Sequence, residues 1–344
     1  MHASRVFEFG PPCALRWSAV ADPRPGRGEV VVEVAAAGVN RADALFRAGR
    51  YHRGPALPAT PGLEGAGEVV AVGDGVDGFS AGDRVLGWGA IGDPGFYAER
   101  AALPAARLLP VPAGVELTAA AALPVAWLTA WYCLRRLGAV QPGDDVLVHA
   151  GASGVGSAAV QIAKDAGAHV IATAGGEAKL KWVRDLGADV VLDHTTTDVP
   201  AEVLRLTEGR GANVVLDLVG GETFAGSLRA AARAANVVAL ANVALAPSVI
   251  DTRDFYPKNV HIHGFQITDL MEHGYDPRPD LTDLLDALAE RRFTVPVDST
   301  FPLSDAAAAH ERLESRAVLG KVLLDVAVPR SYGDPAATGG GGDQ

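Results

Sequence analysis

The sequence predicts an α/β protein with two domains, one rich in β-strands and one formed by a doubly wound parallel sheet. Its 344 residues exceed the roughly 100–200 residues usual for a single domain. Residues 29–110 contain short β-branched runs separated by glycine turns, which is typical of a β-rich sheet. From Asp145 onward, strand-like and helix-like segments alternate about every two dozen residues, as in parallel strands joined by crossover helices.

A long apolar segment lies between these two patterns. Ala119 to Leu137 predicts a helix that is interrupted at Pro124 and ended by Gly138, at the border of the domains. Further along, residues 266–328 contain helices and a final strand, which we expect to return to the first domain. Residues 329–344 include four consecutive glycines and almost no apolar side chains, so we expect a disordered tail.

The composition argues against several classes of function. A formal net charge of −11, with scattered Lys and Arg, disfavours nucleic acid as a partner. No apolar run approaches the ~18 residues needed to span a bilayer, and no export leader is visible, so we expect a cytoplasmic protein with no membrane partner. Cys13 and Cys133 are too few for a disulfide framework.

The stretch VLVHAGASGVGSAAVQIAKDAGAHVIATAG, residues 146–175, predicts a strand, a glycine-rich turn, a helix and a second strand. Gly151, Gly154 and Gly156 would let the backbone approach a ligand phosphate at the helix N-terminus. Ser153 replaces the middle glycine of a dinucleotide fingerprint and offers a hydroxyl to a phosphate oxygen. The alternative is a tight turn without a ligand. The position of the turn in a βαβ series favours a dinucleotide site.

The end of the second strand favours NADPH over NADH. A ribose 2′-hydroxyl is usually held there by Asp or Glu, whereas a 2′-phosphate requires a nearby cation. The strand ends without an acid at Gly175, and Lys179 and Lys181 follow. Glu177 argues the other way unless it faces solvent. The two lysines also fit an ordinary solvated helix face.

Several motifs in order resemble a known family. They are AAAGVNRADALFRAGRY, PGLEGAGEVVAVG, GDRV, AAALPVAWLTAWYCL, VLVHAGASGVGSAAVQIAKDAGA, LDLVGG and LGKVLLD. Together they resemble the zinc-free, zeta-crystallin-like quinone oxidoreductases of the medium-chain dehydrogenase/reductase superfamily, over about residues 5–325. The resemblance implies a GroES-like catalytic domain at 1–122, a Rossmann NADPH-binding domain at 123–265, and a return to the catalytic domain at 266–328.

The resemblance also implies roles for individual residues in cofactor binding. The pyrophosphate turn would consist of Ser153, Gly154, Val155 and Gly156. Gly175 and Lys179 would form the adenosine-phosphate pocket, with His194 beside them. The nicotinamide side would be lined by Tyr51, Thr129, Asn242 and Phe265. Without the family, His194 would more often be a surface loop histidine.

The same resemblance indicates whether the chain has the ligands of a catalytic metal. Zinc-dependent relatives have Cys where this chain has Asn40, and His where it has Leu63. An amide and an apolar side chain cannot replace the thiolate and imidazole ligands of catalytic zinc. His261 and His263 point the same way on a predicted strand, but no third ligand accompanies them. We therefore predict no metal.

Without a metal, hydrogen-bond donors must stabilise the negative charge that develops on an acceptor oxygen during hydride transfer. The candidates for catalysis are the amide of Asn40 and the hydroxyls of Tyr51 and Thr129. Asn40 has an alternative or additional role as a helix cap. Asp43 and Arg47 have the spacing of a helix ion pair. Glu64 is expected to be a buried carboxylate bonded to the backbone.

Three functions remain open from the sequence. The first is NADPH-dependent reduction of a quinone or related activated carbonyl or alkene. The second is an enoyl reductase acting on an enone or enoyl thioester, in which Tyr51 would donate a proton to the α-carbon. The third is a non-catalytic NADPH-binding protein. The resemblance further suggests a homodimer formed through an edge strand such as NVHIHGF.

Overall fold

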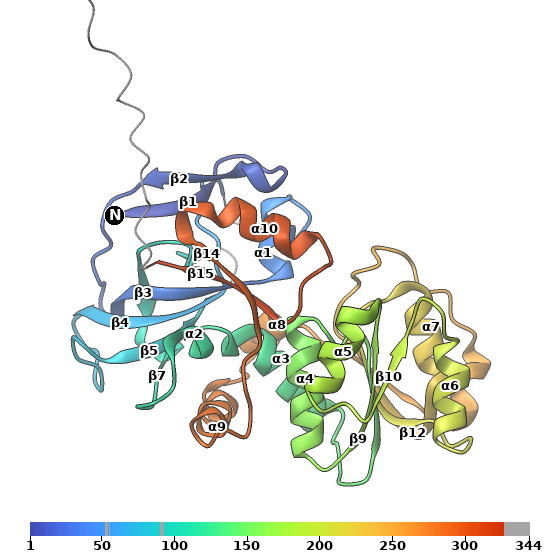
Figure 1. The fold of residues 1–344 in the computed structure, drawn as a ribbon. Helices are drawn as coiled ribbons and strands as arrows, with labels where there is room; N and C mark the ends of the chain where they lie inside the picture. Colours follow the sequence, from blue (N-terminus) through green and yellow to red (C-terminus); the bar gives the residue numbers. More distant parts are fainter. Residues whose placement is uncertain (52–53, 55, 90–92, 327–344) are drawn as a thin grey trace, which may run out of the picture.

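Two β-sheets, each covered by helices, form the body of the molecule (Figure 1). The computed structural model describes residues 1–51, 54, 56–89 and 93–326. The predicted tail at 329–344 lies outside the described residues. The predicted fold class, α/β with a β-rich part and a parallel-sheet part, is confirmed.

The β-rich sheet gathers strands from both ends of the described chain. Its order is β14-β15-β3-β4-β5-β7, and β6 pairs with β3 beside that path. Its strands are β3 (Glu29–Val39), β4 (Glu64–Val72), β5 (Arg84–Trp88), β6 (Arg100–Pro104), β7 (Leu108–Pro110), β14 (Val297–Pro302) and β15 (Lys321–Asp325). A separate hairpin-like pair, β1 (His2–Val6) and β2 (Leu15–Ala19), lies alongside. The two short helices at this end are α1 (Arg41–Arg47) and α10 (Ala306–Glu314).

The second sheet is parallel throughout, in the order β10-β9-β8-β11-β12-β13. Its strands are β8 (Asp145–Val148), β9 (His169–Ala174), β10 (Val190–Asp193), β11 (Ala212–Asp217), β12 (Ala231–Ala239) and β13 (His261–Gly264). The order reverses between β8 and β11, which is the switch point where open α/β sheets bind ligands.

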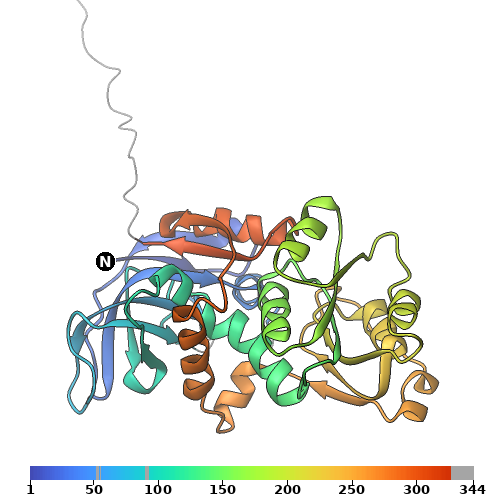
Figure 2. The ribbon, with the colours of Figure 1, turned by 60° about the horizontal axis from the view of Figure 1, so that its bottom comes forward.

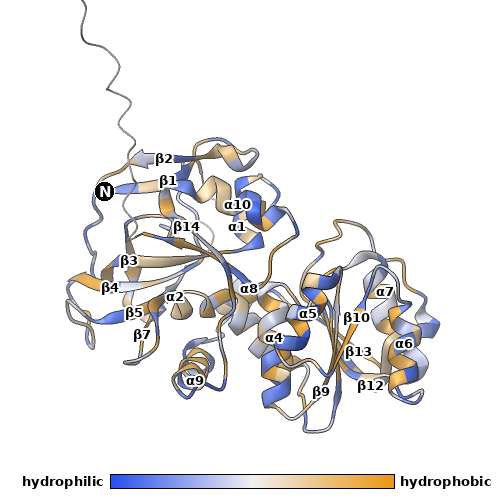
Figure 3. Ribbon diagram, in the orientation of Figure 1, coloured by the Kyte–Doolittle hydropathy of each residue, from blue (hydrophilic) through white to orange (hydrophobic). Residues whose placement is uncertain are grey.

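Helices cover both faces of this parallel sheet. In Figure 1, α4 and α5 lie on one side of the strands, and α6 and α7 on the other. Their bounds are α4 (Gly154–Asp165), α5 (Glu177–Asp185), α6 (Val199–Leu206) and α7 (Gly221–Ala230). Figure 3 shows apolar strands between helices whose outer surfaces are hydrophilic. Burial of continuous apolar strands on both faces is what a parallel sheet requires.

The predicted helix at the domain border is present, with changes of helix type. It consists of α2 (Leu117–Ala120), the π-helical η3 (Leu123–Trp127), α3 (Leu128–Tyr132) and the π-helical η4 (Cys133–Leu137). The break falls just before Pro124, as predicted, because proline lacks an N–H for the preceding turn.

This helix corrects one expectation from the sequence. Leu117–Leu137 is long and apolar enough to cross a bilayer, although no apolar run of that length was expected. It packs in the core instead, since 72% of its apolar window is buried inside the protein. Among the described residues it is the one helix that meets this test, and burial accounts for its apolar character.

The chain returns to the first sheet after the parallel sheet is complete. Next come α8 (Ile267–Glu272) and α9 (Arg278–Ala289), and α9 packs against α3 (Figure 2). β15 then pairs antiparallel with β3, opposite Ala36 to Val39. The parallel sheet is thus inserted between two parts of the β-rich sheet, and the start of β15 places Lys321 beside Asn40.

Candidate functional site

The glycine-rich turn begins α4 in the way that anion binding requires. Ser153 is the N-cap, and its Oγ accepts a hydrogen bond from Gly156 N at 3.0 Å. The same hydroxyl donates to Ala150 O at 2.8 Å. Its single proton is therefore used inside the turn, and the predicted contact from this hydroxyl to a phosphate oxygen, which stays a prediction, would require the proton to leave Ala150 O. Gly154 and Val155 are the first two residues of α4, and N–H groups at the start of a helix have no partner within the helix, so they can bind an anion.

The glycines of the turn have different tasks. A Cβ at Gly156 would lie 2.2 Å from Ala150 O, so no other residue fits there without a shift of the backbone. A Cβ at Gly154 would lie 3.5 Å from its nearest neighbour, Gly320 O. Gly156 is thus required by the turn itself, whereas a side chain at Gly154 would only be in ordinary contact with Gly320 of the returning segment.

The adenosine side of the predicted site is assembled at the ends of β9 and β10. Gly175 and His194 are adjacent, since a Cβ at Gly175 would lie 2.9 Å from His194 Nε2. The Lys179 ammonium donates to the backbone carbonyl of Arg316, and burial, followed by the charge of Arg312, lowers its pKa. Lys181 instead pairs with Asp185 at 2.6 Å on the exposed surface of α5.

The sequence did not point to Arg316. This exposed residue lies in the loop between α10 and β15, which the fold brings to Lys179 from 137 residues away. Arg316 thus supplies a backbone acceptor to the Lys179 ammonium. No local pattern identifies it, because the proximity arises only from the return of the chain.

The predicted nicotinamide side is formed by α3 and the loop after β13. Phe265 packs on Tyr132 with ring centroids 5.5 Å apart, and Tyr132 belongs to the same helix as Thr129. Gln266 Nε2 donates to Tyr51 Oη at 3.1 Å. Three of the predicted residues, Tyr51, Thr129 and Phe265, therefore come from segments that meet here.

Asn242 lies further along this side. Its Nδ2 donates to Ala246 O at 3.1 Å, so its amide stabilises its own loop. A Cβ at Gly220 would come within 2.7 Å of Asn242 Oδ1, so this loop packs tightly on the turn after β11.

A buried polar cluster surrounds Asn40. Lys321 Nζ donates to Asn40 Oδ1 at 2.6 Å and forms an ion pair with Glu64 Oε1 at 2.5 Å. Asn40 Nδ2 donates to the same Glu64 oxygen at 2.8 Å. The side chains of Lys321 and Glu64 are 5% and 0% exposed. We call Asn40, Glu64 and Lys321 the inner cluster.

Glu64 also holds the helix at the domain border. Its Oε2 accepts the backbone N–H of Val125 at 2.7 Å, within η3 and one turn before Thr129. The prediction of a buried carboxylate bonded to the backbone is confirmed, and the ion pair with Lys321 is an addition to it.

Helix α1 shows one correct prediction and one error. Asn40 is the N-cap of α1, and its backbone N–H donates to the carboxylate of Asp43 at 3.0 Å. The proposed pair of Asp43 with Arg47 is wrong, because Arg47 pairs with Glu314 of α10 at 2.7 Å. Asp43 instead accepts a second N–H from Gly62 at 3.2 Å. Burial raises the pKa of Asp43 to about 7, although the Lys321 ammonium acts in the opposite direction.

A cavity of about 220 Å³ lies beside this site, between β5 and α8. Its lining includes Trp88, Arg107, Thr268, Met271 and Tyr275. Thr268 accepts a hydrogen bond from Gln266, the residue that contacts Tyr51. A larger cavity of about 490 Å³ lies between η4 and α9, is lined mainly by charged residues, and includes none of the predicted site residues. The smaller cavity is therefore the one relevant to the site.

Comparisons with known proteins agree with this arrangement. Residues 26–113 match the alcohol dehydrogenase GroES-like domain, and residues 154–290 match the family described as zinc-binding dehydrogenase. Quinone oxidoreductase from Rattus norvegicus is 33% identical over 328 residues, which cover 94% of this chain and 97% of the relative. The chain belongs to the zeta-crystallin-like quinone oxidoreductase family of the medium-chain dehydrogenase/reductase superfamily.

Solved structures of this oxidoreductase superfamily share the whole fold. Escherichia coli quinone oxidoreductase complexed with NADPH has a TM-score of 0.87 at 30% identity, covering 94% of this chain and 100% of that one. An NAD-dependent alcohol dehydrogenase has a TM-score of 0.86 at 36% identity, covering 95% and 100% of the two chains. The protein is thus similar throughout its fold to oxidoreductases described with different nicotinamide dinucleotides.

One matched family is described as zinc-binding, but the residues at the two ligand positions of this chain do not fit that ion. At the two positions discussed above stand Leu63, which is buried, and Asn40, whose oxygen is occupied by an ammonium group. Over the part of the chain that the structure describes, no three His, Cys, Asp or Glu side chains cluster as metal ligands.

Proposed function

We propose that this protein is an NADPH-dependent oxidoreductase that transfers hydride, without a metal, to a quinone or a related activated carbonyl or alkene. The observation that carries the proposal is a direct contact between the two halves of the site. Gly320 N donates to Ala152 O in the glycine turn at 2.9 Å, and the next residue, Lys321, contacts Asn40. The turn that would bind a dinucleotide therefore adjoins a buried hydrogen-bond donor.

The choice of NADPH rests on the adenosine side. His194 lies beside Gly175, and Lys179 follows in the first turn of α5. No acid ends β9, and Glu177 is exposed. A related structure contains NADPH. A 2′-phosphate would replace the Arg316 carbonyl as the partner of Lys179, because a charged acceptor forms the stronger hydrogen bond.

Thermal shift measurements test this choice. We expect a larger stabilisation by NADPH than by NADH at equal concentration, since ligand binding stabilises the folded state. Lys179→Ala should weaken NADPH binding by roughly 10-fold, about the value of one charge-assisted hydrogen bond, and leave NADH binding nearly unchanged. Lys181→Ala, which removes a surface pair on the same helix, is the matched control. An equal or larger shift with NADH would contradict the proposal.

In the proposed reaction, bound NADPH supplies the hydride. The protein's part is to bind the acceptor, hold it in place and stabilise the charge that develops on its oxygen. An Asn40 N–H, the Tyr51 hydroxyl and the Thr129 hydroxyl are the proposed donors. Quinones suit such a site because their reduction is intrinsically easy, and the cavity beside Thr268 would receive the remainder of the acceptor.

A panel assay that follows NADPH absorbance tests the reaction. We expect turnover with quinones, and we expect the rate to be unchanged after treatment with a chelator and dialysis. A rate that falls on chelation and returns with Zn²⁺ would contradict a metal-free reaction. NADPH binding without turnover by any acceptor would favour a non-catalytic binding protein.

An enoyl reductase is the second candidate. Gln266 donates to Tyr51 Oη, which would stabilise the phenolate left when that hydroxyl gives a proton to an α-carbon. Tyr51→Phe would then abolish reduction of enoyl thioesters while sparing quinones. Loss of both activities in equal measure would instead assign Tyr51 to binding.

We further propose that the protein forms a homodimer through the free edge of β13. This strand ends the parallel sheet, and Ile262 is 41% exposed on it. Exposed edge strands pair readily with a second copy. Analytical ultracentrifugation should give a dimer for the native chain and a monomer for Ile262→Lys. A monomeric native chain would contradict this proposal.

A further inference from the structure

The orientation of the Asn40 amide is fixed by the two charged groups that contact its oxygen and its nitrogen. An ammonium group can only donate hydrogen bonds and a carboxylate can only accept them. Lys321 Nζ lies 2.6 Å from Oδ1, and Glu64 Oε1 lies 2.8 Å from Nδ2. A flipped amide would place its NH₂ against the ammonium and its oxygen against the carboxylate. The two charged neighbours therefore permit one orientation of the side chain.

This orientation leaves one amide N–H weakly engaged. The Nδ2 group has two protons, of which one is held by Glu64. The other faces Gly38 O at 3.5 Å, at the outer limit of a hydrogen bond. Such a proton can change partner at little cost. It is a donor of fixed direction inside a site from which water is largely excluded.

The residue that fixes the amide is also attached to the cofactor turn. Gly320 N donates to Ala152 O at 2.9 Å, and Gly320 forms a parallel bridge with Ser153. A Cβ at Gly154 would lie 3.6 Å from the Lys321 side chain, so the stem of the lysine lies against the turn. The position of Lys321, and with it the direction of the amide, depends on the docking of the turn.

We propose that Lys321 and Glu64 are positioning residues that direct one Nδ2–H of Asn40 toward the acceptor oxygen. We further infer that this direction depends on the glycine-rich turn, because Gly320 and Lys321 contact that turn. The inference rests on the proposed function. The charges of Lys321 and Glu64 compensate each other, so their effect on the reaction passes through the amide. Neither residue needs to touch the acceptor.

A double-mutant cycle separates this role from simple support of the fold. Asn40→Ala should lower the rate of quinone reduction on the order of 100-fold, the usual effect of removing one donor to a developing oxyanion. Lys321→Met should cause a similar loss in the native chain and almost no further loss in the Asn40→Ala background. Losses that multiply would overturn the proposal.

Lys321→Met leaves Glu64 unpaired and could fail to fold. The Glu64→Gln/Lys321→Met variant removes both charges with side chains of similar size, so it should fold, bind NADPH as the native chain does, and still show the loss. Native activity in this variant would overturn the proposal. Lys164→Met is the matched control, because Lys164 also pairs with a carboxylate, Asp189, but contacts none of the predicted site residues.

A second readout does not require turnover. The chain has five asparagines, so selective ¹⁵N labelling of Asn gives five side-chain NH₂ groups in an NMR spectrum. With NADP⁺ bound, addition of a quinone should shift one of the two Asn40 Nδ2 protons more than the other, and this selectivity should vanish in Glu64→Gln/Lys321→Met. Shifts of both protons by equal amounts would overturn the inference. Absence of turnover by the native chain would contradict the proposed function separately.

Discussion

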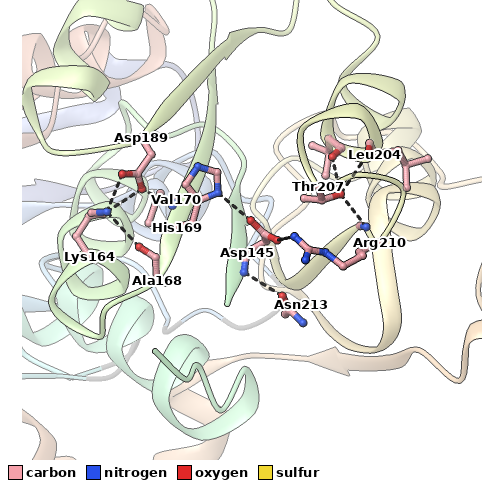
Figure 4. Close-up of polar contacts among 12 residues, drawn as sticks. Asp145, Lys164, Ala168, His169, Val170, Asp189, Leu204, Thr207, Arg210 and Asn213 are labelled. Carbon is pink, nitrogen blue, oxygen red and sulfur yellow. Dashed lines mark hydrogen bonds and ion pairs between the residues drawn. The ribbon is translucent and has the colours of Figure 1, made fainter. Parts of the chain in front are cut away.

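Two lysine–carboxylate pairs in this protein have the same chemistry in different surroundings. Lys321 and Glu64 lie 2.5 Å apart in the inner cluster and are almost fully buried. Lys164 of α4 and Asp189 lie 2.7 Å apart and are 34% and 33% exposed, at the edge of the parallel sheet where its strands begin (Figure 4). The comparison shows how burial changes what an ion pair contributes.

The exposed pair belongs to a wider set of contacts that we call the outer network. Figure 4 shows Asp145, at the start of β8, between His169 and Arg210. Asp145 Oδ1 lies 2.8 Å from His169 Nδ1, and Oδ2 lies 3.5 Å from the Arg210 guanidinium. Partial burial would raise the pKa of Asp189, but hydrogen bonds from Lys164 and Val170 N–H outweigh it and leave that pKa below its ordinary value.

Water can replace the partners of Lys164 and Asp189, which are about one-third exposed, but the almost fully buried side chains of Lys321 and Glu64 are shielded from it. The outer network links segments at the starts of strands, and its members contact none of the predicted site residues. The inner cluster joins β4, β15 and η3, and it fixes the side chain of Asn40. An exposed ion pair therefore only links two surface segments, whereas the buried ion pair also fixes the orientation of a third group, the Asn40 amide.

The largest expected difference is in stability. Lys321→Met should lower the free energy of unfolding by about 3–5 kcal/mol, because it leaves Glu64 buried without its ion partner. Lys164→Met should lower it by about 1 kcal/mol or less, because Asp189 remains accessible to water. Urea denaturation of both variants measures this. Equal losses would mean that burial does not distinguish the two pairs.

The pH dependence of stability should reveal Asp43, which adjoins the inner cluster. Its folded-state pKa of about 7 lies above the ordinary value of 3.8. The contribution of Asp43 to stability is therefore complete below about pH 4, and it is lost as the pH rises through 7. Asp43→Asn should remove a slope of up to about 1.4 kcal/mol per pH unit between these limits.

Denaturation of the native chain and Asp43→Asn at several pH values measures this slope. Asp189→Asn is the matched variant, because its folded-state pKa is shifted downward instead. Its difference from the native chain should change with the opposite sign as the pH rises. Parallel pH profiles for the native chain and Asp43→Asn would show that Asp43 titrates normally.

Salt should produce the smallest difference. The coupling energy between Lys164 and Asp189, measured by a double-mutant cycle, should be about 0.2–1 kcal/mol at low ionic strength and fall toward zero in 1 M NaCl. The coupling between Lys321 and Glu64 should change little, since ions do not enter the buried site. A strong salt dependence of the inner pair would indicate that water reaches it.

The sequence predicted those features that depend on local pattern. The alternation after Asp145 identified the parallel strands, and the apolar run with Pro124 identified the helix at the domain border. Glu64 was recognised as a buried carboxylate because a charged residue between glycines in an apolar segment requires a backbone partner. Asn40 was placed correctly as the cap of α1.

The residues that sequence reasoning missed or misassigned depend on distant contacts. Lys321 reads as an ordinary lysine at the start of a strand until β15 brings it to Asn40. Arg47 has Asp43 four residues before it, but the fold offers Glu314 of α10 in a better geometry. In each case a three-dimensional neighbour competes with the partner that spacing suggests.

The late position of Lys321 in the chain has a consequence for synthesis. Asn40 and Lys321 are separated by 281 positions, which take on the order of 15–60 s to translate at about 5–20 residues per second. During that interval the acidic part of the inner cluster exists without its cation. The inner cluster can therefore be completed only after β15 has emerged from the ribosome.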